Sequence, residues 1–307
     1  MSLSLDETVS PEPARAYTRA AVWITDGSLV LMALIWGVNF SVVKFGTEQM
    51  AALAFNGARL TVASCALVLI ALGMRRTRVA RRDLVALLLL GVLGNGVYQL
   101  LFIEGVALTR AGDAALVVAA SPALIALIGR MLGVDRIGMR GALGIALSIA
   151  GIGFVVYSGT RVVVKGASVT GDLLVLAGGV SWALYTVLLL PYTHRVDGVT
   201  LSTYTMLGGT VALDLAALPY IVHTSWRTIR PLAWGAILYS GLGALVIAYL
   251  FWYRGMRVIG PTRTAMYSNL QPLFALVVAW AMLGEAPTPW QGVGAVCIMS
   301  GLLLTRA

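Results

Sequence analysis

The chain repeats a sparse set of residues at intervals of about 150 positions. Asp, Trp, Gly and Pro recur with the same separations in both halves, whereas matches among Leu and Ala carry little weight in so apolar a sequence. The recurring pairs are Asp26-(x9)-Trp36 with Asp172-(x9)-Trp182, and Gly105-(x16)-Pro122 with Gly255-(x16)-Pro272. We interpret the chain as two copies of one unit. If each copy crosses a membrane an odd number of times, the second copy is inverted relative to the first.

Composition places the chain in a membrane. Hydrophobic residues make up 59% of the 307 residues and charged residues 11%, and the mean hydropathy is +0.88. A soluble domain cannot bury so much apolar surface. The net charge of +9 reflects Arg in membrane loops, so we expect no nucleic-acid partner. Cys65 and Cys297 lie in apolar runs as small packing residues, and His194 and His223 lie near helix ends, so we expect neither a metal nor another cofactor.

Ten segments are apolar enough to cross a bilayer as helices, each of which needs about 20 residues. The predicted fold is an all-α integral membrane protein, with ten transmembrane helices arranged as two inverted five-helix repeats around a central cavity. The segments are 27–46, 52–73, 84–107, 112–132, 139–157, 172–192, 200–222, 232–253, 261–283 and 290–305.

Lys and Arg are distributed unevenly between the two sides of these segments. With the N-terminus in the cytoplasm, fifteen of them fall on the inner side and six on the outer side, and only Arg59 lies within a span. This excess predicts that both termini are cytoplasmic. Residues 1–24 then form a cytosolic tail, residues 25–160 the first repeat, and residues 161–307 the second, inverted repeat.

Helix-breaking residues mark where a pathway could run. Irregular backbone is tolerated inside a membrane only where protein or a watery cavity surrounds it. Gly94 and Gly96 interrupt the third span, and Pro122 and Pro272 lie within the fourth and ninth. Proline removes a backbone donor and frees a carbonyl near the preceding turn. These four residues are candidate gating positions, although fixed kinks that only shape packing explain the two prolines equally well.

The fifth and tenth spans differ from the others because they lack ionisable residues away from their ends. They carry small residues suited to close helix packing, namely Gly144, Ser148, Gly292, Gly294 and Gly301. We interpret these two spans as a scaffold or a dimer surface, not as part of a cavity wall.

Aromatic and amide side chains gather near the membrane midplane. Trp36 and Trp182 lie about ten residues into their spans, although Trp usually prefers the membrane interface. Asn and Gln at this depth are costly without polar company. The set predicts a largely apolar pocket with a few hydrogen-bonding groups, although any single ring can equally belong to the core. The candidate pocket residues are Trp36, Asn39, Tyr98, Gln99, Phe102, Ser121, Trp182, Tyr185, Trp252, Tyr267 and Gln271.

Charged residues within the spans are few. We interpret Arg59 as a side chain that extends to the outer interface; binding of an anion or carboxylate from within a cavity is the alternative. Glu104 is placed to pair with Arg59 or Lys44, and Asp214 is the more buried carboxylate by position. Neither carboxylate lies beside the aromatic set, so the sequence favours movement of a solute down its own gradient over proton coupling.

These residues resemble the drug/metabolite transporter superfamily, in its ten-helix, EamA-like branch. The resemblance covers nearly the whole chain after residue 25 and implies a carrier in the bacterial inner membrane. Its central cavity would be lined by the first four and the sixth to ninth helices. The matching stretches are Leu34-Ile-Trp-Gly-Val-Asn-Phe, Ser181-Trp-Ala-Leu-Tyr-Thr, Ala114-Ala-Leu-Val-Val-Ala-Ala-Ser-Pro122, and Ala265-Met-Tyr-Ser-Asn-Leu-Gln-Pro272 with Leu283-Gly-Glu285.

Within that branch the chain is most similar to bacterial exporters of amino acids, particularly aromatic ones. The implied function is export of aromatic or bulky neutral amino acids from the cytoplasm, as two halves rock around the pocket. The rings suit stacking on an aromatic side chain, and the amides and Ser121 suit its polar ends. We expect a monomer surrounded by membrane lipid.

Other functions are weaker fits to the same residues. Hydrophobic cations could stack on the rings, but no acidic residue lies between Asp26 and Glu48, where small multidrug relatives depend on a glutamate. Phosphate esters need more basic side chains than Arg59, unless Lys44 and others reach inward. A channel would differ by flux that does not saturate. An enzyme is not expected, because no G-x-S-x-G, paired carboxylates or mid-depth histidine occurs.

Overall fold

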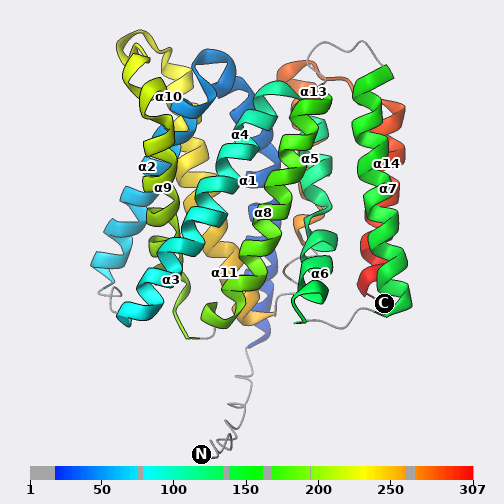
Figure 1. Ribbon diagram of the computed structural model, residues 1–307, viewed down its shortest axis with the longest axis horizontal. Helices are drawn as coiled ribbons and strands as arrows, with labels where there is room; N and C mark the ends of the chain where they lie inside the picture. Colours follow the sequence, from blue (N-terminus) through cyan, green and yellow to red (C-terminus); the bar gives the residue numbers. More distant parts are fainter. Residues whose placement is uncertain are drawn as a thin grey trace, which may run out of the picture.

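The computed structural model describes residues 18–74, 79–133, 138–161, 168–193, 195–259, 264 and 267–306. The described residues form helices and short connections (Figure 1), and no strand occurs among them. The elements are α1 (Arg19–Gln49), α2 (Ala52–Gly73), α3 (Arg81–Gly91), η1 (Val92–Val97), α4 (Tyr98–Leu108), α5 (Ala111–Ala119), α6 (Ser121–Met131), α7 (Met139–Arg161), α8 (Val169–Thr193), α9 (Gly198–His223), η2 (Trp226–Thr228), α10 (Pro231–Leu238), η3 (Tyr239–Ile247), α11 (Ala248–Val258), α13 (Gln271–Leu283) and α14 (Pro289–Arg306).

Hydrophobic length agrees with a protein that crosses the membrane many times. Within the described chain, seven helical segments are long and apolar enough to span a bilayer, and the apolar helices 139–155 and 271–283 are shorter. Several sequence predictions lie outside the described residues, among them most of the N-terminal tail, the start of the ninth span and His194. The seven segments are 19–49, 52–73, 81–108, 111–131, 169–193, 198–223 and 231–255.

The helices lie side by side and run between two ends of one bundle (Figure 1). α1 begins and α14 ends at the lower end of this view, whereas α1 ends and α5 begins at the upper end. α7 and α14 pack closely on one another and stand at one side of the bundle. We use "upper end" and "lower end" in this sense below.

Small residues allow α7 and α14 to approach closely, as the sequence predicts. A Cβ added to Gly301 would lie 2.3 Å from Ser148 Oγ and 2.4 Å from Gly144 O, and one added to Gly294 would lie 2.9 Å from Gly151 O. Gly292 is the exception, because nothing lies within 4 Å of its added Cβ. Four of the five predicted contact residues are therefore confirmed at this seam.

Two spans contain π-helical segments near their middles. η1 joins α3 to α4, and η3 joins α10 to α11. The wider π turn disturbs the regular α-helical hydrogen-bond ladder, and side chains from other helices bond carbonyls in both segments. Ser181 of α8 donates to Leu93 O at 2.9 Å, and Trp36 of α1 donates through Nε1 to Ala244 O at 2.9 Å.

The predicted fourth span is divided into two helices instead of being bent. α5 ends at Ala119 and α6 begins at Ser121, with Pro122 in its first turn. Pro272 has the same place in α13, directly after Gln271. The first turn of a helix has amide groups without intrahelical acceptors, so proline is accommodated there without losing a hydrogen bond. Both prolines therefore mark breaks in the helical backbone.

Gly94 and Gly96 in η1 offer a matched pair of substitutions. A Cβ at Gly94 would lie 2.3 Å from the ring of Tyr185, whereas the nearest atom at Gly96 is Ala212 Cβ at 3.4 Å. We expect Gly94→Ala to destabilise the protein by about 1–3 kcal/mol, because the ring or the backbone must move. Gly96→Ala should leave the stability near that of the unaltered chain, since its new contact is an ordinary one. Thermal melting in detergent measures both, and equal melting temperatures would contradict the packing described at Gly94.

Candidate functional site

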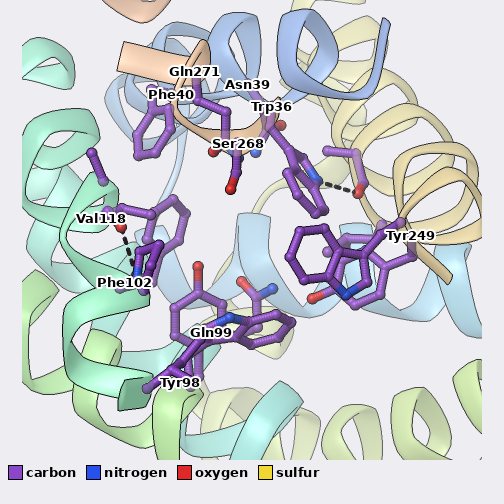
Figure 2. Close-up of a pocket in the computed structure, with 18 of the residues that line it drawn as sticks. Trp36, Asn39, Phe40, Tyr98, Gln99, Phe102, Val118, Tyr249, Ser268 and Gln271 are labelled. Carbon is purple, nitrogen blue, oxygen red and sulfur yellow. Dashed lines mark hydrogen bonds between the residues drawn. The ribbon is translucent and has the colours of Figure 1, made fainter. Parts of the chain in front are cut away.

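A cavity lies at the centre of the bundle, between helices from both halves of the chain. The empty space between its walls, with the solvent at its mouth included, is about 910 Å³. Figure 2 shows the labelled side chains around an open centre. The cavity is lined by Trp36, Asn39, Phe40, Arg59, Tyr98, Gln99, Phe102, Val118, Ala119, Ser121, Pro122, Ile125, Trp182, Ala244, Leu245, Tyr249, Trp252, Ser268 and Gln271.

Aromatic rings form a nearly continuous series along the cavity wall. They come from α1, α4, α8 and α11, and neighbouring rings are tilted or edge-on, which is the favoured arrangement for aromatic pairs. Such a wall offers ring faces and edges to an apolar or aromatic ligand. The centroid distances are 5.7 Å for Phe40–Phe102, 5.6 Å for Tyr98–Phe102, 5.2 Å for Tyr98–Trp182, 5.9 Å for Trp182–Tyr249, 5.9 Å for Trp36–Tyr249 and 5.8 Å for Trp36–Trp252.

Polar side chains lie on opposite sides of the cavity. Asn39, Ser268 and Gln271 lie on one side, and Gln99 lies on the other (Figure 2). Asn39 is 7% exposed, and its Oδ1 has no hydrogen-bond partner among the described residues. Since a buried polar atom without a partner is unfavourable, Asn39 Oδ1 is an unsatisfied acceptor in a residue of the cavity wall.

The structure brings together most of the residues that the sequence selects. Nine of the eleven candidate pocket residues line the cavity. Tyr185 does not line the cavity. Its ring packs against the ring of Trp182, with centroids 5.3 Å apart, and fills the space beside Gly94. Tyr267 is also absent from the lining, and it packs on the small cluster of Leu29, Met32 and Ala248.

The four candidate gating residues occupy three different environments. Pro122 lines the cavity at the α5–α6 break, whereas Pro272 is buried beside Gln271 without lining it. Gly94 and Gly96 are buried in η1.

Ten lining residues are absent from the eleven candidate pocket residues, and the aromatic, charged or hydroxyl-bearing ones among them are Phe40, Arg59, Tyr249 and Ser268. The interpretation of Arg59 as a side chain that extends to the interface is wrong, because the residue is 1% exposed and its guanidinium bonds inward. Arg59 donates to Asn56 and Gln99 instead of pairing with Glu104. Asn56, one helical turn before Arg59, was the signal in the sequence that this face of α2 points inward.

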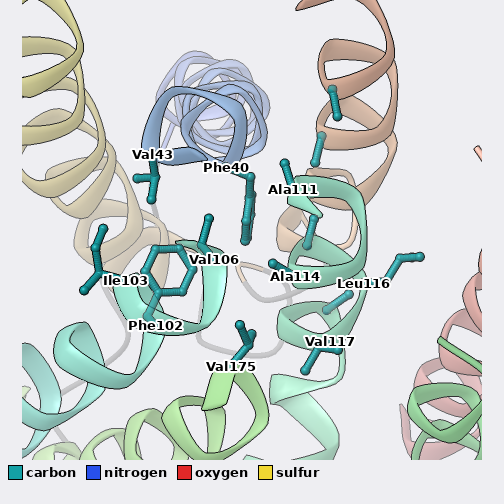
Figure 3. Close-up of a cluster of buried hydrophobic side chains, with 14 of the residues drawn as sticks. Phe40, Val43, Phe102, Ile103, Val106, Ala111, Ala114, Leu116, Val117 and Val175 are labelled. Carbon is teal, nitrogen blue, oxygen red and sulfur yellow. The ribbon is translucent and has the colours of Figure 1, made fainter. Parts of the chain in front are cut away.

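Apolar side chains of α1, α4, α5 and α8 form a buried cluster (Figure 3), and α1 ends and α5 begins at the upper end. Phe40 and Phe102 belong both to the cavity wall and to this cluster. Val43 of α1, Val106 of α4 and Ala114 of α5 continue it and are fully buried. We refer to Phe40, Val43, Phe102, Val106 and Ala114 as the upper cluster.

A buried ionic contact reinforces the upper end. Gly284 ends α13 in the left-handed conformation, with φ of 68°, which favours glycine. The turn places Glu285 at the start of α5, where its carboxylate accepts from Ala111 N at 3.2 Å and Gly112 N at 3.3 Å. A carboxylate is stabilised there by unpaired amides and by the helix dipole. Arg110 completes the contact by donating to Ala286 O at 2.6 Å, with Nε 3.9 Å from Glu285.

Two other carboxylates near this contact are buried more deeply than Glu104 and Asp214, which are both half-buried. Asp113 is 1% exposed and Asp172 is 0% exposed. Asp113 Oδ1 accepts from Gln291 of α14 at 2.8 Å, and Asp172 Oδ1 accepts from Thr109 at 2.7 Å. These bonds tie the start of α5 to α14, and the end of α4 to the start of α8.

Comparisons with known proteins agree with this architecture. The profile described as the EamA-like transporter family matches residues 23–157 and again residues 169–307. An uncharacterized transporter, YyaM, of Bacillus subtilis (strain 168) is 27% identical over 90% of this chain and 91% of its own length. A probable terminal-alkyne amino-acid exporter of Streptantibioticus cattleyicolor is 31% identical over 92% of both chains.

A solved crystal structure shares the fold. Its TM-score is 0.64 at 20% sequence identity, with 94% of this chain and 96% of the other covered. At 20% identity, this similarity supports a shared fold and nothing further. The family assignment rests on the two profile matches, which cover most of the sequence. The chain is a multi-pass membrane transporter that belongs to the EamA-like transporter family.

Proposed function

We propose that this protein exports amino acids with aromatic or bulky neutral side chains from the cytoplasm by alternating access. The observation that carries the proposal is the central cavity, which has rings on its walls and polar groups on opposite sides. A zwitterionic amino acid has one apolar end and two charged groups, and such a cavity can accommodate all three. The relative described as a probable amino-acid exporter adds support from outside the structure.

The rings and polar groups suggest separate roles in binding. Trp36, Tyr98, Trp182 and Trp252 would contact the substrate side chain. Asn39 Oδ1, an acceptor without a partner, would receive the substrate ammonium group. Gln99, Ser121 and Gln271 would complete the polar contacts. Tyr185 would act indirectly, by supporting the ring of Trp182, and Tyr267 would do so by packing on the cluster of Leu29, Met32 and Ala248.

We also propose that residues 25–160 and 161–307 are inverted five-helix repeats, which gives ten spans in total. The family profile matches once in each half. α1 of the first half bonds η3 of the second through Trp36, and α8 of the second half bonds η1 of the first through Ser181. This reciprocal exchange is what a pseudo-twofold relation between the halves produces.

The upper cluster and the Glu285 contact would form the closed gate. α5 packs against α1, α8 and α13 near the upper end, whereas α6 packs on α7 and α8. The cavity would therefore face the lower end, with Pro122, Pro272, Gly94 and Gly96 at the points where helices bend. The excess of Lys and Arg on one side supports a cytoplasmic lower end, which would place both termini in the cytoplasm of a bacterium and the carrier in its inner membrane. A monomer contains the complete cavity.

Counterflow in proteoliposomes tests the proposed substrate class. Vesicles loaded with unlabelled solute and kept at equal pH on both sides receive trace labelled phenylalanine, threonine, tetraphenylphosphonium or glucose 6-phosphate. We expect labelled phenylalanine to accumulate transiently inside the vesicles, because a carrier exchanges solute without a proton gradient. Labelled threonine should accumulate less, because its side chain offers little apolar surface to the aromatic walls. Accumulation confined to the cation or the sugar phosphate would replace the amino acid with that substrate. Flux that does not saturate would indicate a channel.

Substitution of two tryptophans tests the pocket. Trp182 lines the cavity, whereas Trp290 stacks on Phe154 of the α7–α14 pair with centroids 6.2 Å apart. We expect Trp182→Ala and Gln271→Ala to reduce phenylalanine counterflow about tenfold or more, because each removes a direct contact with the substrate. Trp290→Ala is the control and should retain most of the activity when normalised to folded protein. Similar losses from all three variants would contradict the pocket assignment.

Glu285 tests the proposed gate. Glu285→Gln removes the charge at the start of α5, so the closed upper end should open more often. In a background with Cys65→Ala and Cys297→Ala, we expect Glu285→Gln to increase labelling of Val106→Cys by an impermeant maleimide about fivefold or more. Asp83→Asn is the control, since Asp83 forms a partly exposed pair with Arg195 at 4.0 Å. Equal labelling rates in the two variants would show that Glu285 does not hold the gate.

A further inference from the structure

Arg59 presents a buried positive charge to the central cavity. It lies on α2, is 1% exposed and forms part of the cavity wall. Its guanidinium also lies over the Phe102 ring, with Cζ 5.9 Å from the ring centroid. The charge is therefore held at the same depth as the proposed substrate side chain.

Neutral side chains hold the guanidinium in place. Nε donates to Asn56 Oδ1 at 2.7 Å, Nη1 to Ser240 Oγ at 2.8 Å, and Nη2 to Gln99 Oε1 at 2.5 Å. Asn56 is fixed in turn, because its Nδ2 donates to the Gln99 backbone oxygen at 2.8 Å. The three partners come from α2, η3 and α4, so both halves of the chain orient this group.

These bonds satisfy hydrogen bonding but supply no negative charge. Among the described residues, the ion pairs join Arg110 to Glu285 and Arg195 to Asp83, and neither includes Arg59. A guanidinium has five N–H donors, of which the three bonds above use three. The remaining donors can bind another acceptor, and carboxylate geometry matches the guanidinium fork.

A buried cation without a counter-ion is unfavourable inside a membrane. Neutral hydrogen bonds reduce the desolvation penalty without removing it. An anionic ligand that enters the cavity would offset the remaining penalty and gain charge-assisted bonds in surroundings of low dielectric. The unpaired Arg59 guanidinium therefore favours binding of solutes that carry a negative charge over binding of solutes that do not.

We propose that Arg59 binds the carboxylate of the transported amino acid and makes an anionic group a requirement for transport. The assignment rests on the proposed function, and it narrows the substrate class to apolar molecules that carry an acid group. The ammonium group is less important, because its partner Asn39 is neutral. Phenethylamine, which has the ring and amine of phenylalanine without the acid, is not a substrate. 3-Phenylpropionate, which has the ring and acid without the amine, is bound.

Competition on the unaltered protein provides the first test. Phenylalanine counterflow is measured with a tenfold excess of 3-phenylpropionate, phenethylamine or phenylalaninamide, and binding is followed by the shift in melting temperature. We expect 3-phenylpropionate alone to compete and to raise the melting temperature. Competition by phenethylamine or phenylalaninamide equal to that of 3-phenylpropionate overturns the role of Arg59. Because this test uses the unaltered protein, its result does not depend on whether a variant folds.

Substitution of Arg59 provides the second test. Arg59→Gln removes the charge and keeps one amide donor for its three neutral partners, so its folding is checked by thermal melting before binding is compared. We expect it to weaken phenylalanine binding about tenfold to a hundredfold and to abolish the shift caused by 3-phenylpropionate. Arg59→Lys keeps the charge without the fork and should recover part of the binding. Arg195→Gln, which removes an exposed arginine outside the cavity, is the matched control.

The outcomes separate this assignment from the proposed function. If phenylalanine undergoes counterflow and Arg59→Gln binds it as tightly as the unaltered protein, the Arg59 assignment fails and the proposed function stands. If phenylalanine is not transported but 3-phenylpropionate or glucose 6-phosphate stabilises the protein in an Arg59-dependent manner, the amino-acid proposal fails and the anion requirement stands.

Discussion

Hydrogen bonding of the backbone inside the membrane is the constraint on which the rest of this structure depends. Hydrocarbon offers no partner to a free carbonyl, so irregular backbone must be satisfied by other parts of the protein. In η1 and η3, Ser181 and Trp36 bond the carbonyls of Leu93 and Ala244. This requirement explains why a tryptophan lies at mid-depth. It also fixes where a cavity can form, since polar groups and breaks in the helices have to be collected in one place.

The same exchange of bonds makes each half of the chain incomplete without the other. Ser240 of the second half orients Arg59 of the first, and Glu285 of the second half caps α5 of the first. Individual contacts of this kind contribute about 1–3 kcal/mol. In the alternating-access mechanism proposed above, a few such contacts would hold a closed arrangement firmly enough to be occupied and weakly enough to be broken by substrate binding.

Sequence reasoning predicted what is unusual in a membrane and missed what depends on helix rotation. Trp36 and Gln271 were identifiable because rings and amides at mid-depth require an explanation. Tyr185 lies one helical turn after Trp182 on α8, and Tyr267 lies one turn before Gln271, yet neither of them lines the cavity. Arg59 was misread because depth along a helix predicts whether a side chain can reach the interface, but not which face carries it. The Glu285 contact joins the turn after α13 to the start of α5, far away in the sequence, and no local pattern reveals such a contact.

Rings and charge contribute differently to the choice of substrate. Aromatic walls bind many apolar molecules, and one methylene more or less changes the binding free energy by only about 1–3 kcal/mol. A buried charge discriminates more strongly, because a ligand that lacks the opposite charge leaves that group desolvated without compensation. In this cavity the rings are numerous and Arg59 is the cation on the described wall. The walls would therefore determine how tightly a solute is held, whereas Arg59 would determine which solutes are admitted.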